Sequence, residues 1–520
     1  MGSDPIVFAP SRLYAQLTST PMRPLLCLFL ALTASAADRP NVLWFVVDDM
    51  SANFGSYGET TIATPHVDRL AKEGTRFSRA YVTAPVCSPC RSALVTGMYQ
   101  TTIGAQHHRS GRGELKINLP AEVTPTPKIF QQGGYYTCIG SGLTDLDFRG
   151  LPFGAGKGKK AKTGGAGNRL GKTDYNFEWD PAIYDSHDWA GRKPGQPFFM
   201  QVQLNGGKLR EGQEAARVKF REQVVSELGA VTDPSKVTLP PYYPRDPVLL
   251  QDWADYLDAV RMTDLHVGRV LARLEKEGQL ANTLVVFMTD HGISHARGKQ
   301  FLYEEGAHVP LVIRGPGVPA GLVRPDLVEH IDLAALSLAA AGLGVPAWMQ
   351  GKDILASNYV KRDEAYSARD RCDETTEKIR SLRTDKFIYI RNYHPERPHL
   401  QPCAYKDGKA IVQQLRALHT AGKLSELSEK LLFRPTRPRE ELYELAADRW
   451  QIRNLAEDPA YGAMLADHRR RLDAKLVATK DPAPESMAMY DSDMKPYVGK
   501  GSPVIESNIA QMKKWASEGK

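Results

Sequence analysis

The chain has 520 residues, of which 42% are hydrophobic and 24% are charged. These values are typical of a globular protein long enough for one large domain and one smaller domain. The formal net charge of +7 suits an anionic ligand. The sequence has no arginine-rich arm, zinc-finger spacing or heptad repeat, so nucleic acid is not an expected partner.

The N-terminal segment has the pattern of a secretory signal. From Met22 onward it has a basic start, a short apolar run and an Ala-x-Ala site. The apolar run is too short to span a membrane. We therefore expect residues 1–37 to be a leader that truly starts at Met22. The protein is expected to be secreted or periplasmic and not membrane-spanning.

Two acidic residues follow the first predicted strand. Residues 41–47 form a continuous apolar run, which is typical of a buried central strand in an α/β sheet. Asp48 and Asp49 come at the carboxyl end of this strand, where such sheets place ligands. Adjacent carboxylates are costly to bury, and a divalent cation would offset that cost. The alternative is an exposed acidic turn.

A cysteine lies at the start of the second predicted helix. Residues 64–74 predict a first short helix, with a capping threonine and proline at its start and a glycine at its end. The second helix is predicted from Ser88 to Thr96, so Cys87 lies at its N-terminus, where an anion is favoured. Arg91 lies about one turn further on. The alternatives are a structural thiol and, with Cys90, a metal or redox site.

The next polar residues lie in predicted loops. His107 and His108 are adjacent and either contact a substrate or lie in a solvated loop. A stretch rich in glycine and lysine at about 151–170 predicts an inserted loop, and Lys172 and Asp174 follow it.

Two further predicted strands each end in polar residues. Residues 197–204 lead to Lys208, which could bind an anion, donate a proton if burial lowered its pKa, or lie on the surface. After an amphipathic helix at 252–278, residues 283–289 predict a strand that leads to Asp290 and His291.

The last third of the chain changes character at about residue 360. After an apolar helix at 332–343, residues 379–391 alternate in the manner of an antiparallel hairpin. Residues 369–375 carry paired charges that suit either sugar recognition or an ion-pair network. Little periodicity follows residue 480. We therefore predict a catalytic domain at 38–360, a C-terminal subdomain at 361–480 and a tail at 481–520. A pairing of Cys372 with Cys403 stays open.

Several blocks, in the same order, resemble the type I, formylglycine-dependent sulfatases of the alkaline phosphatase superfamily. Residues 87–91 match the signature Cys-x-Pro-x-Arg, and Asp48-Asp49 and Asp290 flank it in family order. Lys299 lies in a block similar to the family's "K…YEGG…VPLI", and residues 442–456 resemble its "LYDL…NLA" segment. Parts of the chain are similar to the heparan N-sulfoglucosamine sulfohydrolase branch.

The resemblance implies a fold and a chemistry. The fold is an α/β, alkaline-phosphatase-like sandwich with a large mixed or parallel central sheet and a smaller C-terminal α+β subdomain. A formylglycine-generating enzyme would convert Cys87 to 3-oxoalanine, whose hydrate attacks the sulfur of a sulfate ester. One divalent ion is implied, with calcium expected, although calcium prefers oxygen to the nitrogen of a histidine. Its implied ligands are Asp48, Asp49, Cys87, Asp290 and His291.

The resemblance also assigns roles around the nucleophile. The implied catalytic residues are Cys87, Arg91, Lys172, Lys208 and Lys299. The expected substrate-binding residues are His107, His108 and Asp174. The family's Gly-Lys-x-His is absent after Gly134-Tyr135-Tyr136-Thr137, so Lys172 is taken as the displaced lysine and Asp174 as the replacement for the histidine. Lys208 stands where many members have a histidine. The candidates for the general acid are therefore Lys208, His107 and His108, in that order.

The expected function is that of a secreted sulfatase acting on a sulfated carbohydrate, at ester sulfate or at N-sulfate. One alternative is a phosphonate or phosphodiester hydrolase of the same superfamily. A second alternative is a non-catalytic glycan-binding protein in which Cys87 is unmodified. The oligomeric state is left open.

Overall fold

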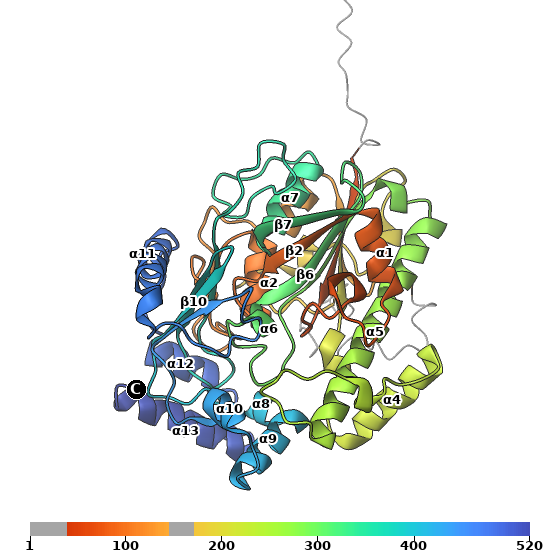
Figure 1. Cartoon of the computed structure of the whole chain (residues 1–520). Coiled ribbons are helices and arrows are strands. Elements are labelled where there is room, and N and C mark those ends of the chain that lie inside the picture. The colour runs from red at the N-terminus through yellow and green to blue at the C-terminus, as the bar shows by residue number, and fades with distance from the viewer. Residues whose placement is uncertain (1–38, 145–170) are drawn as a thin grey trace, which may run out of the picture.

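A seven-stranded sheet forms the centre of the larger part of the molecule (Figure 1). The computed structural model describes residues 39–144 and 171–520, and within them the strand order is β3-β4-β1-β5-β6-β2-β7. Neighbouring strands pair in parallel except at β6, which is antiparallel to β5 and β2. The strands are β1 Asn41–Val47, β2 Thr75–Tyr81, β3 Tyr136–Gly140, β4 Phe198–Leu204, β5 Thr283–Thr289, β6 His308–Arg314 and β7 Leu322–Glu329.

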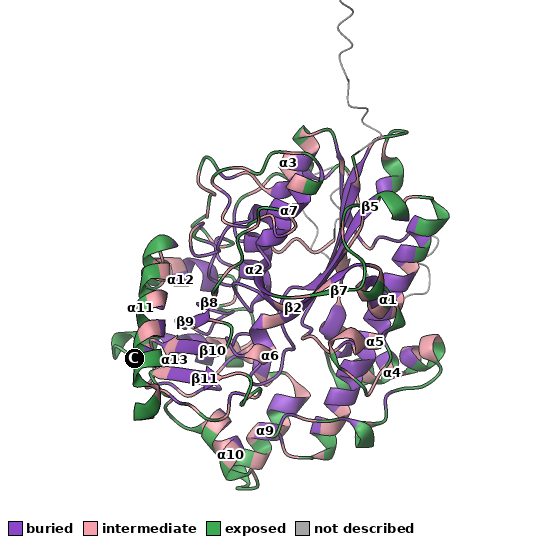
Figure 2. Cartoon of the chain, turned by 45° about the horizontal axis from the view of Figure 1, so that its top comes forward, coloured by how far each residue is buried: buried purple, intermediate pink, exposed green. Residues whose placement is uncertain are grey.

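Helices cover both faces of this sheet, and the side chains of β1 show why. Leu43, Phe45 and Val47 pack in one hydrophobic cluster, while Val42, Trp44 and Val46 pack in another on the opposite face. A strand buried on both faces reads as a continuous apolar run. Figure 2 shows these strands buried and the outer faces of the helices exposed. Helices α1 Pro65–Glu73 and α5 Pro247–Lys276 cover the first face; α2 Cys87–Thr96, α3 Thr126–Gln132 and α7 Asp332–Ala340 cover the second.

A smaller antiparallel sheet follows in the C-terminal part, with the order β11-β10-β9-β8. One of its faces packs on α11 through Leu382, Leu465 and Leu472. Its other face packs on Phe301 and Tyr303, so it supports the loop that follows Lys299. The elements are β8 Ala365–Arg369, β9 Ile379–Arg383, β10 Phe387–Asn392, β11 Glu440–Glu444 and α11 Gly462–Ala478.

The predicted elements of the core are confirmed. The strands at 41–47, 197–204 and 283–289 and the hairpin at 379–391 form as expected. Helix α5 begins at Pro247, earlier than predicted, because Asp246 accepts a hydrogen bond from the backbone of Val248 and caps it. The remaining helices are α4 Glu214–Leu228, α6 Glu304–Ala307, α8 Ala404–Asp407, α9 Ala410–Thr420 and α10 Glu426–Ser428.

The tail contains two helices that the sequence did not predict, α12 Met487–Met494 and α13 Pro503–Ser517. These helices have only a few buried apolar residues each, which form a small cluster of their own, so the sequence shows little periodicity. Arg371 forms buried ion pairs with Glu485 and Asp493 and ties the tail to the body. The domain boundaries themselves stay predictions.

The five cysteines of the described residues are all unpaired. Cys372 and Cys403 form no disulfide, and the side-chain amide of Gln300 donates hydrogen bonds to both sulfurs, at 3.1 and 3.6 Å. The predicted leader at 1–37 and the predicted inserted loop at 151–170 lie outside the described residues. Within the described ranges, we find no helix with both the length and the apolar character needed to cross a bilayer.

Candidate active site

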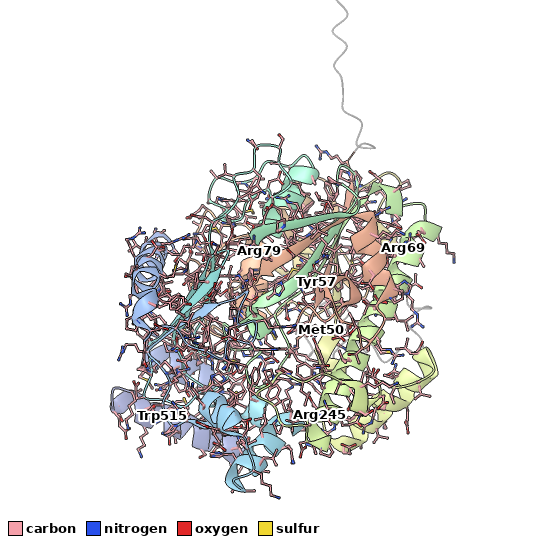
Figure 3. All side chains as sticks on the ribbon, in the orientation of Figure 1. Met50, Tyr57, Arg69, Arg79, Arg245 and Trp515 are labelled. Atoms are coloured by element: carbon pink, nitrogen blue, oxygen red, sulfur yellow. The ribbon has the colours of Figure 1, made fainter. Side chains whose placement is uncertain are left out.

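The predicted acidic residues meet at one edge of the central sheet. Strands β1 and β5 are neighbours with Val47 opposite Thr289, so the residues that follow them emerge side by side. The backbone N–H of Asp49 donates to Asp290 Oδ1 at 3.1 Å. Met50, the next residue, is labelled near the middle of the molecule in Figure 3. The carboxylates are therefore held by the ends of two adjacent strands.

Cys87 lies at the first position of α2 and faces these acids. Its Sγ is 3.2 Å from His291 Nε2, 3.1 Å from Lys299 Nζ and 3.8 Å from Asp49 Oδ1. We call the group around this sulfur the Cys87 cluster. It consists of Cys87, Asp48, Asp49, Asp290, His291, Lys172, Lys208, Lys299, His108 and Asp174.

Four members of the cluster could hold a metal ion. Each of these residues offers one ligand atom, and the four atoms lie within 4.8 Å of one another. The residues are Asp49, Cys87, Asp290 and His291. His291 Nδ1 is 2.9 Å from the carbonyl oxygen of Gly292 and donates to it, while Nε2 lies 3.3 Å from both Asp49 Oδ1 and Asp290 Oδ1 and is the nitrogen that would bind a metal.

The electrostatics of these residues also suit a cation. Burial raises the pKa of Asp290 to about 6; His291 opposes this shift, while Asp48 and Cys87 add to it. Burial also raises the pKa of Asp49, but Lys208, Lys299 and His291 outweigh it and hold that pKa well below the ordinary value, so Asp290 is the acid that a divalent ion would chiefly stabilise. The oxygen, nitrogen and sulfur donors of these four residues therefore fit a divalent ion. Asp48 lies outside this group of four, and its part as a ligand stays a prediction. Arg91, Lys172 and Lys208 contact its oxygens.

Three lysines surround the acids and the thiol. Lys172 Nζ is 2.9 Å from Asp48 Oδ1, Lys208 Nζ is 2.7 Å from Asp48 Oδ2, and Lys299 Nζ is 3.2 Å from Asp49 Oδ2. Burial opposes ionisation of Cys87, but these lysines and His291 hold its pKa well below the ordinary value. The cluster thus favours an anion at the position of the sulfur.

Two glycines bring Lys208 to the acids. A Cβ atom on Gly206 would lie 2.0 Å from the carbonyl oxygen of Asp48, and one on Gly207 would lie 2.2 Å from that of Asp49. Only residues without a side chain allow this approach. Burial lowers the pKa of Lys208, but Asp48 and Asp49 raise it well above the ordinary value. The lowered pKa that proton donation would require is therefore not found, and anion binding fits better.

Arg91 supports the acids from the side of α2. Its Nε donates to Asp290 Oδ2 at 3.1 Å, and its guanidinium also contacts Asp48 and Gln203. This arrangement fixes two carboxylates with one rigid cation. The predicted part of Arg91 at the nucleophile stays a prediction.

The side chains of the two adjacent histidines face different parts of the molecule. His108 is buried, with Nδ1 3.0 Å from Asp373 Oδ1, and one of its nitrogens lies within 4.8 Å of both Cys87 Sγ and an oxygen of Asp174. Burial opposes its protonation, but Asp373 raises the pKa of His108 well above the ordinary value. Among the described residues, its Nε2 has no hydrogen-bond partner.

His107 faces away from the cluster. Its Nδ1 accepts a long hydrogen bond, of 3.4 Å, from the backbone N–H of Arg371 and lies 4.0 Å from Glu485. Burial, together with Arg371, holds the pKa of His107 well below the ordinary value. The structure therefore brings His108, but not His107, to Cys87, and the predicted substrate contact of His107 gains no support from the geometry.

Other residues that contact the cluster went unnoticed in the sequence. Tyr405 donates its hydroxyl to Asp49 Oδ2 at 2.8 Å, and Lys299 Nζ lies 3.3 Å from the same hydroxyl. No local pattern marks Tyr405. Asp373, the partner of His108, belongs to the charged segment 369–375, where the sequence left sugar recognition and ion pairing open. Gln203 accepts a hydrogen bond from Arg91, and Glu211 lies 3.1 Å from the Tyr405 hydroxyl.

Strained backbone gathers at the same place. Seven non-glycine residues of the described ranges have a positive φ, and five of them belong to the cluster or adjoin it. Such conformations cost free energy and are retained mainly where the surrounding structure and the function require them. The five residues are Asp49, Arg109, Asp174, Gln300 and Asp373.

Comparison with known proteins defines the class. The sulfatase family model matches residues 40–343, more than half of the chain, and the model for the C-terminal part of N-sulphoglucosamine sulphohydrolase matches residues 291–400. The chain therefore belongs to the sulfatase family and is a sulfuric ester hydrolase. The predicted family and its alkaline-phosphatase-like fold are confirmed.

Individual relatives agree with this assignment. The chain is 32% identical over 488 residues to an ulvan-active sulfatase of Formosa agariphila, covering 86% of this chain and 77% of that one. It is 25% identical to human N-sulphoglucosamine sulphohydrolase, covering 88% and 94% of the two chains. A solved complex with the substrate D-glucosamine-2-N,6-O-disulfate matches with a TM-score of 0.57 and 18% identity, covering 86% of this chain and all of that one. The last likeness concerns the fold alone.

Proposed function

We propose that the protein is a secreted sulfatase that removes ester sulfate from a sulfated carbohydrate, using formylglycine made from Cys87 and one calcium ion. The observation that carries this proposal is the position of Cys87 Sγ, 3.1 Å from Lys299 Nζ and 3.2 Å from His291 Nε2, beside the acidic strand ends. The relatives' names, which refer to ulvan and to N-sulfoglucosamine, support a carbohydrate substrate. N-sulfate is the alternative bond.

Most residues of the cluster have a part in this reaction. The 3-oxoalanine would supply the nucleophile, and a divalent ion held by Asp49, Asp290 and His291 would polarise a sulfate oxygen. Lys172, Lys208 and Lys299 bind the sulfate oxygens and stabilise the negative charge that develops on them. The side chains of Lys172 and Lys208 are 32% and 24% exposed, so the cluster is reached from solvent on their side.

His108 is the general acid of the proposal. Its unpartnered Nε2 is free to donate a proton to the leaving oxygen or nitrogen, and Asp373 behind Nδ1 orients the ring. Lys208, first among the sequence candidates, has a raised pKa and so holds its proton too firmly for this part. His107, the second candidate, is directed at Arg371.

Mass spectrometry and sulfate release test the function together. The peptide that contains Cys87, from protein made in its native host, is expected to carry the aldehyde. The protein is expected to release sulfate from monosulfated saccharides. Thiol alone with no sulfate release would favour the glycan-binding alternative. Faster turnover of phosphonate or phosphodiester than of any sulfate would favour the other member of the superfamily. The N-terminus of the secreted protein tests the removal of residues 1–37.

Metal analysis tests the ion. We expect one calcium per chain by elemental analysis, and a chelator is expected to lower both the melting temperature and the activity until calcium is returned. Asp290→Asn is expected to lose the ion, whereas Asp491→Asn, which changes an exposed carboxylate of the tail, is expected to keep it. Stoichiometric magnesium in place of calcium would contradict the choice of ion but not the site.

A further inference from the structure

Two arginines lie on the solvent side of the Cys87 cluster. The side chains of Arg109 and Arg112 are 45% and 44% exposed, whereas that of Lys299, beside the sulfur, is 3% exposed. Arg109 Nη1 is 3.6 Å from Asp373 Oδ1, and Arg112 forms an ion pair with Asp174. Each arginine thus reaches one carboxylate that also adjoins His108.

These ion pairs leave much of the positive charge available. Asp373 also faces His108 at 3.0 Å, and Asp174 also faces Lys172 at 3.6 Å, so each carboxylate is shared between two cations. A guanidinium has five N–H donors. Among the residues that the structure describes, the Arg109 guanidinium makes no hydrogen bond, and that of Arg112 makes one. Half-exposed ion pairs of this kind add little stability. Stability alone therefore gives a weak reason for two arginines here.

The backbone fixes Arg109 relative to the nucleophile. Arg109 has φ +56°, in the left-handed region that non-glycine residues seldom adopt. Its N–H donates to Ser88 Oγ at 2.9 Å, and Ser88 directly follows Cys87 on α2. The neighbouring His108 donates its own N–H to the carbonyl oxygen of Arg371 at 2.8 Å. A strained residue that is tied to the nucleophile's helix holds its side chain at a defined place beside the cluster.

We propose that Arg109 and Arg112 bind a second anionic group of the substrate, a uronate carboxylate or a second sulfate, close to the sulfate that is removed. This inference rests on the proposed function, because it takes the scissile sulfate to lie at Cys87. The planar fork of an arginine matches the paired oxygens of a carboxylate or a sulfate. The substrate class is therefore a sugar that carries at least two anionic groups.

Binding measured without turnover tests the inference. Cys87→Ala protein is titrated by calorimetry with a monosulfated saccharide and with the same saccharide carrying a second sulfate. A sulfated disaccharide with a uronate is compared with its counterpart in which the carboxylate is reduced to an alcohol. We expect the second anion to tighten binding about tenfold or more, as a charge-assisted bidentate contact does. The selectivity ratio is the dissociation constant of the ligand without the second anion divided by that of the ligand with it. Adding Arg109→Gln and Arg112→Gln is expected to bring this ratio close to one.

Two further variants control for unfolding and for general charge. Arg109→Lys keeps the charge but loses the fork, and is expected to restore part of the ratio. Arg453→Gln removes an arginine that is 75% exposed and pairs with Asp458, and is expected to leave the ratio unchanged. If the double variant does not fold, the two single variants carry the same comparison.

The outcomes separate this inference from the proposed function. Three results would overturn the inference. They are a ratio near one in the Cys87→Ala parent, no measurable binding of the dianionic ligands, and a ratio that persists after the double substitution. A ratio raised by only one of the two anions supports it and identifies that anion. Sulfate release by the unaltered protein without any such selectivity leaves the function standing and the inference refuted. Selective binding by a protein that releases no sulfate would refute the function and leave the anion-binding site standing.

Discussion

The two sides of the Cys87 cluster are built in different ways. One side consists of Asp48, Asp49 and Asp290, which follow the adjacent strands β1 and β5. Backbone hydrogen bonds of the sheet hold it, such as Asp290 N–H to the carbonyl of Val47 at 2.7 Å. We call this group the strand side.

The other side consists of the cluster member His108 and of two residues that contact the cluster, Asp373 and Tyr405. These residues come from loops and from the short helix α8. We call it the loop side. Its support comes from remote parts of the chain. Arg371, whose carbonyl holds His108, is paired with Asp493 of the tail. The comparison teaches that the acidic side is fixed by local sheet geometry, while the side assigned to proton transfer depends on packing of the C-terminal region.

The largest effect is expected where the two sides meet. Cys87→Ala removes the group that becomes the nucleophile, so kcat/KM is expected to fall by on the order of 10⁴ or more. The measurement is the initial rate of sulfate release at substrate concentrations below KM. Cys90→Ala is the matched control, since Cys90 is a second buried cysteine of α2 that packs in a hydrophobic cluster. Equal losses for the two variants would contradict the part given to Cys87.

A loop-side variant is expected to have the next largest effect. His108→Gln removes the proposed proton donor, and kcat on saccharide sulfates is expected to fall by about 10²–10³. The loss is expected to be smaller on an aryl sulfate, whose leaving group needs less help from an acid. His107→Gln changes the neighbouring ring, which faces Arg371, and is expected to lower stability more than kcat. Equal losses of His108→Gln on both kinds of substrate would refute the general acid.

The support of the loop side can be broken from the tail. Asp493→Asn removes one carboxylate from the buried Arg371 and is expected to lower the free energy of unfolding by about 3 kcal/mol. Saccharide activity is expected to fall while bound metal is unchanged, because the strand side is untouched. Asp491→Asn, two residues away in an exposed pair with Lys513, is the control. Loss of metal in Asp493→Asn would contradict the separation of the two sides.

The strand side can be disturbed through its glycine contact. Gly206→Ala places a Cβ against the carbonyl oxygen of Asp48 at φ +52°, and is expected to lower stability by about 1–3 kcal/mol and to weaken metal binding. Gly195→Ala has φ +72° with open space around the added atom, so it isolates the backbone cost, about 1 kcal/mol. Denaturant titration measures both. A similar loss in the two variants would show that the contact with Asp48 is unimportant.

Prediction from the sequence succeeded where a signal was local. The strands at 41–47 and 283–289 are runs of apolar residues, and the acids that follow them meet because parallel strands share an edge. Prediction failed for α12 and α13, whose short apolar patches lack a clear period. It could not tell that His108, and not His107, lies near Cys87, because adjacent residues of a loop carry no periodicity that tells which side chain points inward.

The sequence by itself determined the family, three strands of the central sheet and the acidic residues around Cys87, because these follow from motifs and periodic patterns within short segments. Only the tertiary structure decided that His108 lies near Cys87 and His107 against Arg371, and that Asp373 and Tyr405 contact the cluster. These contacts join segments that are far apart in the chain. Their geometry depends on how the C-terminal region packs on the central sheet, and no local pattern encodes it.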